Sequence, residues 1–149
     1  MWKFRTMIPG ATRLGGPITG HNDPRVTRLG RILRRIKLDE LPQFLNVLLG
    51  DMTLVGPRPE APEIVLLYNP SQRSVLRVKP GITGCVQLEA GHEAETLPHG
   101  AVAAEYYVQH LMDRKVHRDL EYLGNRTVVS DAKILVATAV LVLRSIFRG

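Results

Sequence analysis

The residues of this sequence that could do chemistry lie in the stretch KLDELPQ, where Asp39 and Glu40 are adjacent. The stretch directly follows an arginine-rich run, RVTRLGRILRRI. A carboxylate beside several arginines stays ionised, because nearby positive charge favours its charged form. An ionised aspartate can act as a nucleophile toward phosphorus once the charge of the target phosphate is neutralised. The stretch therefore indicates phosphoryl transfer with Asp39 as nucleophile, although the same carboxylate pair is also typical of a helix cap.

Glu40 is a candidate ligand for Mg²⁺. This hard cation typically takes one or two protein carboxylates and fills its shell with phosphate oxygens and water. Together with the arginines, such a cation would neutralise the phosphate that the aspartate attacks. The arginine run by itself is equally typical of a solvated helix face or of a surface that binds anions.

The charge of the chain is concentrated at its N-terminal end. The net charge is +6, and the first sixty residues carry ten Lys/Arg against five Asp/Glu. A focused positive field indicates an anionic partner such as a phosphate or an acidic membrane surface. Nucleic-acid binding ranks last, because only 5% of the residues are aromatic and no recognition motif is present.

Other classes of site and segment are disfavoured. The single cysteine, Cys85, excludes an internal disulfide and argues against a zinc cage, and we interpret it as a small buried hydrophobe. The histidines at positions 21, 92, 99, 110 and 117 lack ligand spacing and are interpreted as surface or loop residues. The start MWKFRTMIPG lacks the apolar core of a signal peptide. The apolar run at 134–143 is shorter than the roughly twenty residues of a spanning helix.

The elements that must position the candidate site are helices and one short strand. Residues 8–24 form a Gly/Pro-rich loop of a kind that rarely holds regular structure. Pro42 places the carboxylate pair at a helix start or break, and Gly50 is suited to end that helix. The pattern MTLV predicts a strand that leads into GPRPE, where two prolines stiffen the backbone around Arg58. Apolar residues at helical spacing predict two helices, one through Leu29, Ile32, Leu33 and Ile36 and one through Leu41, Phe44, Leu45 and Leu48.

The second half of the chain also favours helix. Patterns over 62–68, after Ser71, over 102–112 and over 131–147 predict helices, the last with Ser130 as its cap and Arg144 and Arg148 near its end. The segment 79–84 is interpreted as a turn and 89–99 as a polar loop. The last helix is apolar around nearly its whole circumference, so it needs burial in a core or at a lipid interface.

Five segments of the chain, taken together, resemble one known family. They are KFRTM, NDPRVTRLGRILRRIKLDELPQ, LNVLLGDMTLVGPRPE, KPGITGCVQ and DLEYLGNRTVVSDAKILVATAVLVL. The chain resembles the bacterial sugar transferases, the monotopic polyprenyl-phosphate phosphoglycosyltransferases that begin the assembly of capsule, exopolysaccharide, O-antigen and glycoprotein glycans. The motifs LDELPQ, GDM and GPRP at these separations are far more specific together than any one of them alone.

The resemblance implies a reaction and a role for each matching residue. Such enzymes pass the phospho-sugar of a UDP-sugar to an aspartate, release UMP, and then pass the phospho-sugar to a polyprenyl phosphate. By this resemblance Asp39 is the nucleophile and Glu40 is associated with Mg²⁺, while Arg34 holds a phosphate or docks the incoming N-terminal segment. The nucleotide and phosphate contacts would come from Pro57, Arg58, Pro59, Lys3 and Arg5.

The resemblance also implies a fold and a place in the cell. We expect an α/β (α+β), helix-rich single domain over residues 1–149 with a small β element, associated with the cytoplasmic face of the bacterial inner membrane. The expected partners are a UDP-sugar, a polyprenyl phosphate and anionic lipid, with a homo-oligomer left open. Family members carry a hydrophobic re-entrant helix before KFRTM, which begins here at Lys3. We therefore interpret the chain as N-terminally truncated: a fragment, a product of a wrongly assigned start, or a degenerate copy.

Two interpretations remain open on the sequence. The first is the phosphoglycosyltransferase just described. The second is a remnant of the same family without catalysis, which binds a membrane surface or a partner through its basic helix.

Overall fold

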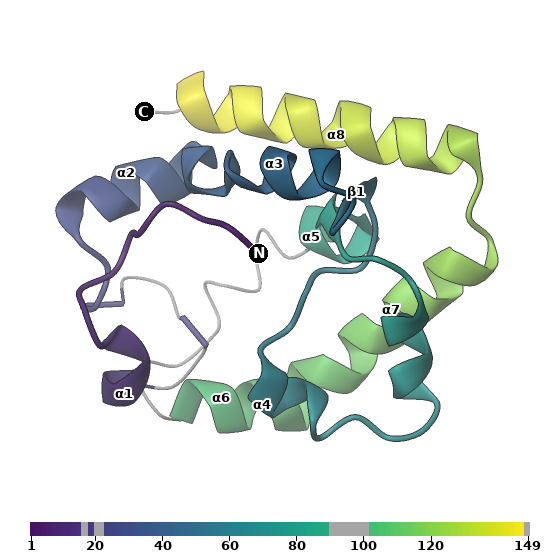
Figure 1. Ribbon diagram of the computed structural model, residues 1–149, viewed down its shortest axis with the longest axis horizontal. Helices are drawn as coiled ribbons and strands as arrows, with labels where there is room; N and C mark the ends of the chain where they lie inside the picture. The colour runs from purple at the N-terminus through teal and green to yellow at the C-terminus, as the bar shows by residue number, and fades with distance from the viewer. Residues whose placement is uncertain (16–17, 20–22, 90–101, 148–149) are drawn as a thin grey trace.

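The computed structural model describes residues 1–15, 18–19, 23–89 and 102–147 (Figure 1). Helices predominate among these residues and one small sheet accompanies them, as the sequence predicted. The elements in chain order are α1 (Ala11–Gly15), α2 (Arg28–Arg35), the 3₁₀ helix η1 (Leu38–Glu40), α3 (Gln43–Leu48), β1 (Thr53–Val55), α4 (Pro62–Val65), the 3₁₀ helix η2 (Gln72–Arg77), β2 (Gly81–Thr83), α5 (Cys85–Glu89), α6 (Val102–Tyr107), the π-helical turn η4 (Val108–Met112), α7 (Asp113–Gly124) and α8 (Val128–Phe147).

The sheet consists of β1 and β2, which pair in parallel with Thr53 opposite Gly81 and Val55 opposite Thr83. The prediction of a turn over 79–84 was therefore wrong. A Cβ atom on Gly81 would lie 2.1 Å from the backbone nitrogen of Gly56. The glycine in KPGITG marks a close approach of two backbones, a second common reason for glycine besides a turn.

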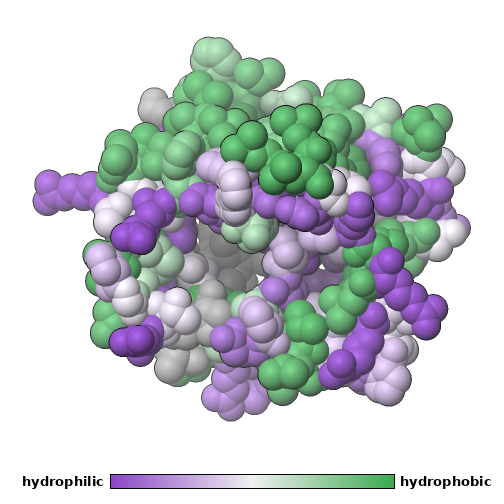
Figure 2. Space-filling view, viewed as in Figure 1, coloured by the Kyte–Doolittle hydropathy of each residue, from purple (hydrophilic) through white to green (hydrophobic). Residues whose placement is uncertain are grey.

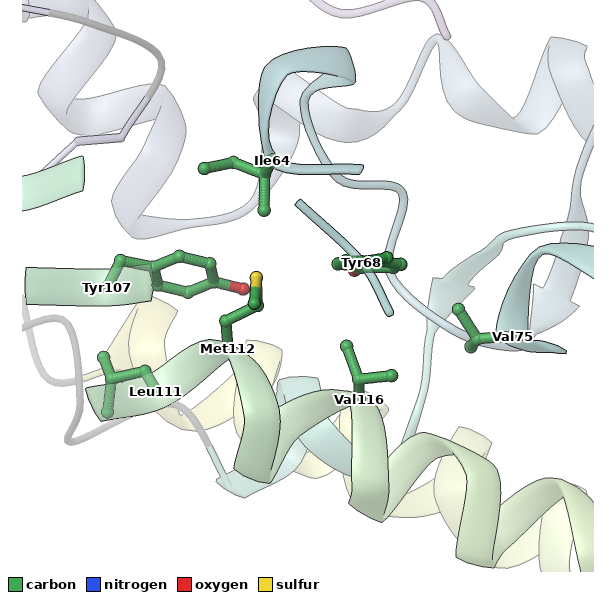
Figure 3. Packing of buried hydrophobic residues seen from close by; sticks show 7 residues of the cluster. All are labelled: Ile64, Tyr68, Val75, Tyr107, Leu111, Met112 and Val116. Carbon is green, nitrogen blue, oxygen red and sulfur yellow. The ribbon is translucent and has the colours of Figure 1, made fainter. Parts of the chain in front are cut away.

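One hydrophobic cluster holds the second half of the chain together. Its buried side chains come from α4, the turn after α4, η2, α6, η4 and α7, and they are shown in Figure 3. They are Ile64, Tyr68, Val75, Tyr107, Leu111, Met112 and Val116. Complete burial of a side chain of this size contributes roughly 1.5–3 kcal/mol, so the cluster fixes α7 under the segment that follows β1.

The helices depart from the sequence predictions at four elements, α1, α5, α7 and α8. Helix α1 lies inside the segment expected to lack regular structure, and neither α5 nor α7 was predicted. Helix α8 begins three residues before the expected start, and Thr127 caps it instead of Ser130. The Thr127 hydroxyl accepts the Ser130 N–H at 3.0 Å, while the Ser130 hydroxyl accepts the Thr127 N–H at 2.9 Å. This reciprocal pair is a capping box in which Ser130 is the third helical residue.

Some predictions lie outside the described residues. These are the polar loop after Glu89, the histidines at 21, 92 and 99, and Arg148. The other two histidines, His110 and His117, are exposed as predicted.

Helices α2, α3 and α8 lie along the upper edge of Figure 1, and many of their apolar side chains are exposed. Helix α8 buries Ile134 but leaves Val136 at 65% and Leu143 at 53% exposure, so the alternative of a buried core helix was wrong. Figure 2 shows a continuous hydrophobic surface along this edge. We call it the apolar face, and its exposed members from α2, the segment around α3, and α8 are Leu29, Ile32, Leu41, Phe44, Leu45, Leu48, Leu49, Leu135, Val136, Val140, Leu141, Leu143, Ile146 and Phe147. Within the described ranges no helix is long and apolar enough to span a membrane.

Candidate active site

The N-terminal segment lies against the elements that carry the carboxylate pair. Ile8 donates its backbone N–H to the carbonyl of Arg25, Phe4 donates to the carbonyl of Asp39 at 3.0 Å, and Trp2 donates to Oδ1 of Asn46 at 2.8 Å. A Cβ atom on Gly30 would lie 2.0 Å from the Thr6 carbonyl oxygen, so α2 approaches this segment backbone to backbone. The segment that begins KFRT is therefore one wall of the site.

A left-handed residue separates α2 from the carboxylate pair. Thr27 caps α2 by accepting the Gly30 N–H at 2.9 Å, and the helix ends at Arg35. Lys37 then adopts φ 57°, which is uncommon for a residue with a Cβ atom, and η1 begins at the next residue. This reversal turns Asp39 toward the interior, where the residue is 7% exposed. The prediction that the pair lies at a helix break is confirmed.

Glu40 joins three segments that are distant in the sequence. Its Oε1 atom lies 2.9 Å from Nζ of Lys3 and 3.0 Å from Nη2 of Arg58. Burial opposes ionisation of Glu40, but the charges of Arg58, Lys3 and Lys37 outweigh it and lower the pKa of this carboxyl to about 2. Glu40 is therefore anionic at any physiological pH, and it holds two basic side chains beside Asp39.

The Pro-Arg-Pro loop leaves the carboxyl end of β1. Gly56 donates to the Thr83 carbonyl and Gly81 donates to the Pro57 carbonyl, each at 2.9 Å, so the start of the loop is fixed by the sheet. Pro57 is buried and Pro59 is half-buried. The Arg58 side chain keeps 43% of its surface exposed while it contacts Glu40, so it can also reach a bound anion.

The carboxylate of Asp39, unlike that of Glu40, is not held by another side chain of the described residues. No described residue donates a hydrogen bond or forms an ion pair to its carboxylate. Arg34 interacts electrostatically with Asp39: burial lowers the pKa of the Arg34 guanidinium, and the charges of Asp39 and, less, of Asp23 oppose this shift. Arg34 donates from Nε to Oγ1 of Thr6 at 2.9 Å, so it docks the N-terminal segment as one of its two expected roles requires. A carboxylate without a partner beside a guanidinium has the electrostatics of a nucleophile for an anionic substrate.

The structure does not bring Arg5 into this cluster. Its side chain is exposed and contacts no charged partner among the described residues. The phosphate role of Arg5 stays a prediction.

Sequence reasoning missed two residues that hold the Pro-Arg-Pro loop. Arg126 donates from Nη2 to the Val55 carbonyl at 3.0 Å and is paired with Asp131 at 2.8 Å. Tyr107 donates its hydroxyl hydrogen to Glu60, the residue that ends GPRPE. An arginine in the connection before α8 was the only sequence signal for the first contact, and the motif GPRPE could have drawn attention to Glu60.

The carboxylates of the site determine whether a metal cation could bind there. The groups of three or more His, Cys, Asp or Glu that could enclose a metal are absent from the described residues. Mg²⁺ does not require such a group, because one or two carboxylates with substrate phosphates suffice. Both ion pairs of Glu40 use Oε1, so among the described residues its second oxygen is left for a cation. The residues present therefore fit a magnesium ion that binds together with a phosphate substrate.

Cys85 differs from its predicted role as a buried hydrophobe. It is half-buried, and its Sγ lies 3.5 Å from Oδ1 of Asp119 on α7. Burial and the Asp119 charge raise the pKa of the Cys85 thiol to about 12, so the thiol stays protonated. Burial is the main cause that raises the pKa of Asp119 to about 6. The charges of Glu60 and Glu89 act in the same direction, whereas the hydrogen bond from Cys85 and the charge of Lys115 lower the pKa.

Replacing Asp119 by asparagine should stabilise the fold near neutral pH. The folded pKa of Asp119 lies above its unfolded value, so its contribution to stability is complete below about pH 4 and is lost as pH rises through 6. Asparagine removes that loss, and we expect the free energy of unfolding near pH 7 to rise by up to about 3 kcal/mol. Urea denaturation of both proteins near pH 7 and near pH 4 tests this. A gain of equal size at both pH values would contradict it.

The sequence model of the family described as "Bacterial sugar transferase" matches residues 1–145. The chain belongs to the bacterial sugar transferase family. The match includes the N-terminal wall, the carboxylate pair and the Pro-Arg-Pro loop, so the cluster just described lies wholly within the matched residues.

Three relatives show what proteins of this family are called. The chain is 39% identical over 146 residues to the UDP-glucose:undecaprenyl-phosphate glucose-1-phosphate transferase of Escherichia coli (strain K12), covering 93% of this chain and 28% of that protein. It is 38% identical over 151 residues to the exopolysaccharide production protein PSS of Rhizobium leguminosarum bv. phaseoli, covering 94% and 68%. It is 34% identical over 152 residues to the UDP-N-acetylgalactosamine-undecaprenyl-phosphate N-acetylgalactosaminephosphotransferase of Aeromonas hydrophila, covering 100% and 32%. The chain thus spans about a third or less of two of these relatives.

Proposed function

We propose that this chain is a phosphoglycosyltransferase, a sugar-1-phosphate transferase that moves a phospho-sugar from a UDP-sugar to polyprenyl (undecaprenyl) phosphate. The observation that carries the proposal is that the two adjacent carboxylates have different surroundings. Glu40 is held by Lys3 and Arg58, while Asp39 is buried beside Arg34 with its carboxylate unengaged by the described residues. The names of the relatives support the same donor and acceptor classes.

The proposed reaction has two displacements at one phosphorus. A carboxylate oxygen of Asp39 attacks the phosphorus that bears the sugar, the bond to the bridging oxygen breaks, and UMP leaves with that oxygen and its electron pair. An oxygen of the polyprenyl phosphate then attacks the same phosphorus and displaces Asp39. The product is a polyprenyl diphosphate sugar, and the aspartate is regenerated. This step would begin the assembly of an exopolysaccharide, capsule or related glycan.

The basic residues lower the barrier by neutralising charge that is already on the diphosphate. Lys3 and Arg58 converge on Glu40 from different segments, so they form a preorganised pair of cations next to Asp39. Arg34 supplies a third cation from α2. A magnesium ion bound at Glu40 and the diphosphate would supply further charge neutralisation and would orient the leaving group.

Release of UMP tests the proposed function. The chain is mixed with UDP-glucose, UDP-galactose or UDP-N-acetylgalactosamine and Mg²⁺, without lipid acceptor, and UMP is measured by chromatography. We expect a burst limited to one equivalent of UMP per chain with the correct donor, and its loss in EDTA. The absence of UMP with each of the three donors, together with vesicle binding, would favour the non-catalytic remnant instead.

The apolar face supports association with a membrane, at the cytoplasmic face of the bacterial inner membrane. Around α3 the usual arrangement is inverted: Leu41 and Phe44 are 48% and 49% exposed, whereas Gln43 is 2% exposed. Exposed arginines of α2, Arg28 and Arg31, lie beside this face. Apolar side chains with flanking cations are typical of a helix that lies in the headgroup region of an anionic membrane.

A charge placed on the apolar face should weaken vesicle binding. Phe44 and Leu48 are exposed, at 49% and 82%, so Phe44→Asp and Leu48→Asp should leave the fold intact. Loss of apolar contact and repulsion from anionic lipid should reduce flotation with phosphatidylglycerol vesicles by about tenfold. The matched control is Leu66→Asp, at a residue that is 74% exposed at the end of α4 and outside the apolar face. Equal flotation of all three variants would contradict a membrane role for this face.

A further inference from the structure

The segment that carries Asp39 continues inward as a row of buried polar residues. Asp39, Gln43 and Asn46 are 7%, 2% and 3% exposed. A helix of a soluble domain normally buries its apolar stripe and exposes its polar one, because burial of a polar group is costly without a partner. Each polar group of this row is therefore expected to have a hydrogen-bond partner.

Both polar atoms of the Asn46 side chain have a partner within the protein. Its Oδ1 accepts the Trp2 N–H at 2.8 Å, and its Nδ2 lies 3.4 Å from Oδ2 of Asp51. Its carbonyl accepts the N–H groups of Asp51 and Met52 at 2.8 and 3.2 Å. Asn46 thus joins the N-terminal segment to the turn before β1.

The side chain of Gln43 differs from that of Asn46 in this respect. Its Nε2 atom is buried and has no hydrogen-bond partner in the described part of the chain. A buried donor without a partner costs roughly 1–3 kcal/mol, and a leucine of similar volume would avoid that cost. The donor is therefore an unfavourable feature of the free protein that a bound acceptor would relieve.

Gln43 follows Asp39 by four residues, and a tight turn joins η1 to α3 between them. Leu41 donates to the Leu38 carbonyl at 3.3 Å, and Phe44 donates to the Leu41 carbonyl at 3.1 Å, so each of these turns spans three residues. Because such turns rise only about 2 Å per residue, Asp39 and Gln43 lie within about 8 Å of each other along the turn axis. Both residues are buried.

We propose that Nε2 of Gln43 donates a hydrogen bond to a nonbridging oxygen of the phosphoryl group that Asp39 attacks. The proposal rests on the function proposed above and adds a substrate contact to it. A carboxamide nitrogen is a donor only, and an anionic phosphoryl oxygen is the strongest acceptor that this reaction brings to Asp39. Arg34, Lys3 and Arg58 supply charge, whereas the neutral amide supplies direction.

The test compares stability with function in Gln43→Leu. The substitution removes the unpaired donor, so the melting temperature should stay equal or rise. With polyprenyl phosphate present to allow turnover, the kcat/KM for UMP release should fall by about 10- to 100-fold, the loss expected for a hydrogen bond to a charged group. Binding is read separately from the fluorescence of Trp2, whose backbone is held by Asn46 in the same row. The affinity for UDP should fall about tenfold and that for uridine should not change.

Gln72→Leu is the matched control. Gln72 is also buried, at 6% exposure, but it is fully paired: its Oε1 accepts the Asn69 N–H and its Nε2 donates to Asp113, both at 2.8 Å. Gln72→Leu should lower the melting temperature and leave kcat/KM unchanged.

The outcomes separate this inference from the proposed function. Release of UMP by the wild type, with Gln43→Leu equal to it in kcat/KM and UDP affinity, overturns the Gln43 contact alone. A parallel loss of melting temperature and activity in Gln43→Leu also overturns it, because it indicates a structural role. Weaker UDP binding in Gln43→Leu with no UMP release by the wild type supports the contact and counts against the proposed reaction. Failure of the wild type to bind UDP overturns both.

Discussion

Asp39→Asn is expected to abolish UMP release, with a loss of at least about 1,000-fold in the rate of the first displacement. Asparagine has nearly the same shape as aspartate, but its amide oxygen is not a competent nucleophile toward phosphorus. The charge that Arg34 experiences from Asp39 disappears as well. The loss should therefore appear in the limiting rate of the burst at saturating UDP-sugar, and it is measured from the initial burst with the preferred UDP-sugar.

The fold should survive this substitution, since no described residue binds the Asp39 carboxylate. We expect the melting temperature of Asp39→Asn to equal or exceed that of the wild type. Asp113→Asn is the matched control, because Asp113 lies on α7, in another part of the fold, and accepts a hydrogen bond from Gln72. Unchanged UMP release in Asp39→Asn would remove Asp39 from the mechanism.

Arg58→Ala is expected to have the second largest effect, a fall in kcat/KM of about 100-fold. Arg58 contacts Glu40 at 3.0 Å while almost half of its side chain remains open to a ligand. Its loss removes one of the cations that neutralise the diphosphate and one of the two that hold Glu40. Arg58→Lys keeps the charge but not the planar fork, so it should recover only part of the activity.

The pH dependence of stability separates the structural share of Arg58 from its catalytic share. Arg58 helps to lower the folded pKa of Glu40 from 4.5 to about 2, so the stability from this pairing is complete above pH 4.5 and is lost as pH falls toward 2. Because Arg58 is partly exposed, its share is at most about 1 kcal/mol. Urea denaturation should show this difference between wild type and Arg58→Ala near pH 7 and its shrinkage below pH 4.5. If Arg58→Ala lost no more activity than this small loss of stability explains, a direct catalytic role of Arg58 would be contradicted.

The sequence predicted the carboxylate cluster well because its members lie in short, specific segments. The motifs KFRTM, LDELPQ and GPRP contain Lys3, Glu40 and Arg58, and the fold brings these three side chains together. Their convergence could not be derived from spacing, since 18 residues separate Glu40 from Arg58 and 37 separate it from Lys3. It follows from the parallel pairing of β1 and β2 and from the path of the N-terminal segment.

Periodicity predicted the helices but not which side of them faces inward. The apolar spacing of Leu41, Phe44 and Leu48 defined one face, and the usual expectation would bury it. The structure buries Asp39 and Gln43 and exposes the apolar residues. Under the membrane role proposed above, a partner outside the chain decides this orientation, so it is absent from a pattern in one sequence. Gln43 gave no signal for the same reason, because glutamine is a common surface residue.

Composition misled where one residue type serves two purposes. Glycine in KPGITG suggested a turn, whereas Gly81 allows two backbones to approach in the sheet. Helix α7 was missed because DRKVHRDLEYLG mixes charged residues with few apolar ones, and its main buried contact to the core is Val116.

The most direct test of the account is the mass of the peptide that contains Asp39 after the chain is mixed with its UDP-sugar and Mg²⁺ and the reaction is stopped before an acceptor is added. This peptide is expected to gain one sugar-phosphate, the added group is expected to lie on Asp39, and polyprenyl phosphate is expected to remove it. A chain that releases UMP but carries the sugar-phosphate on another residue, or on none, would contradict the claim that Asp39 is the nucleophile.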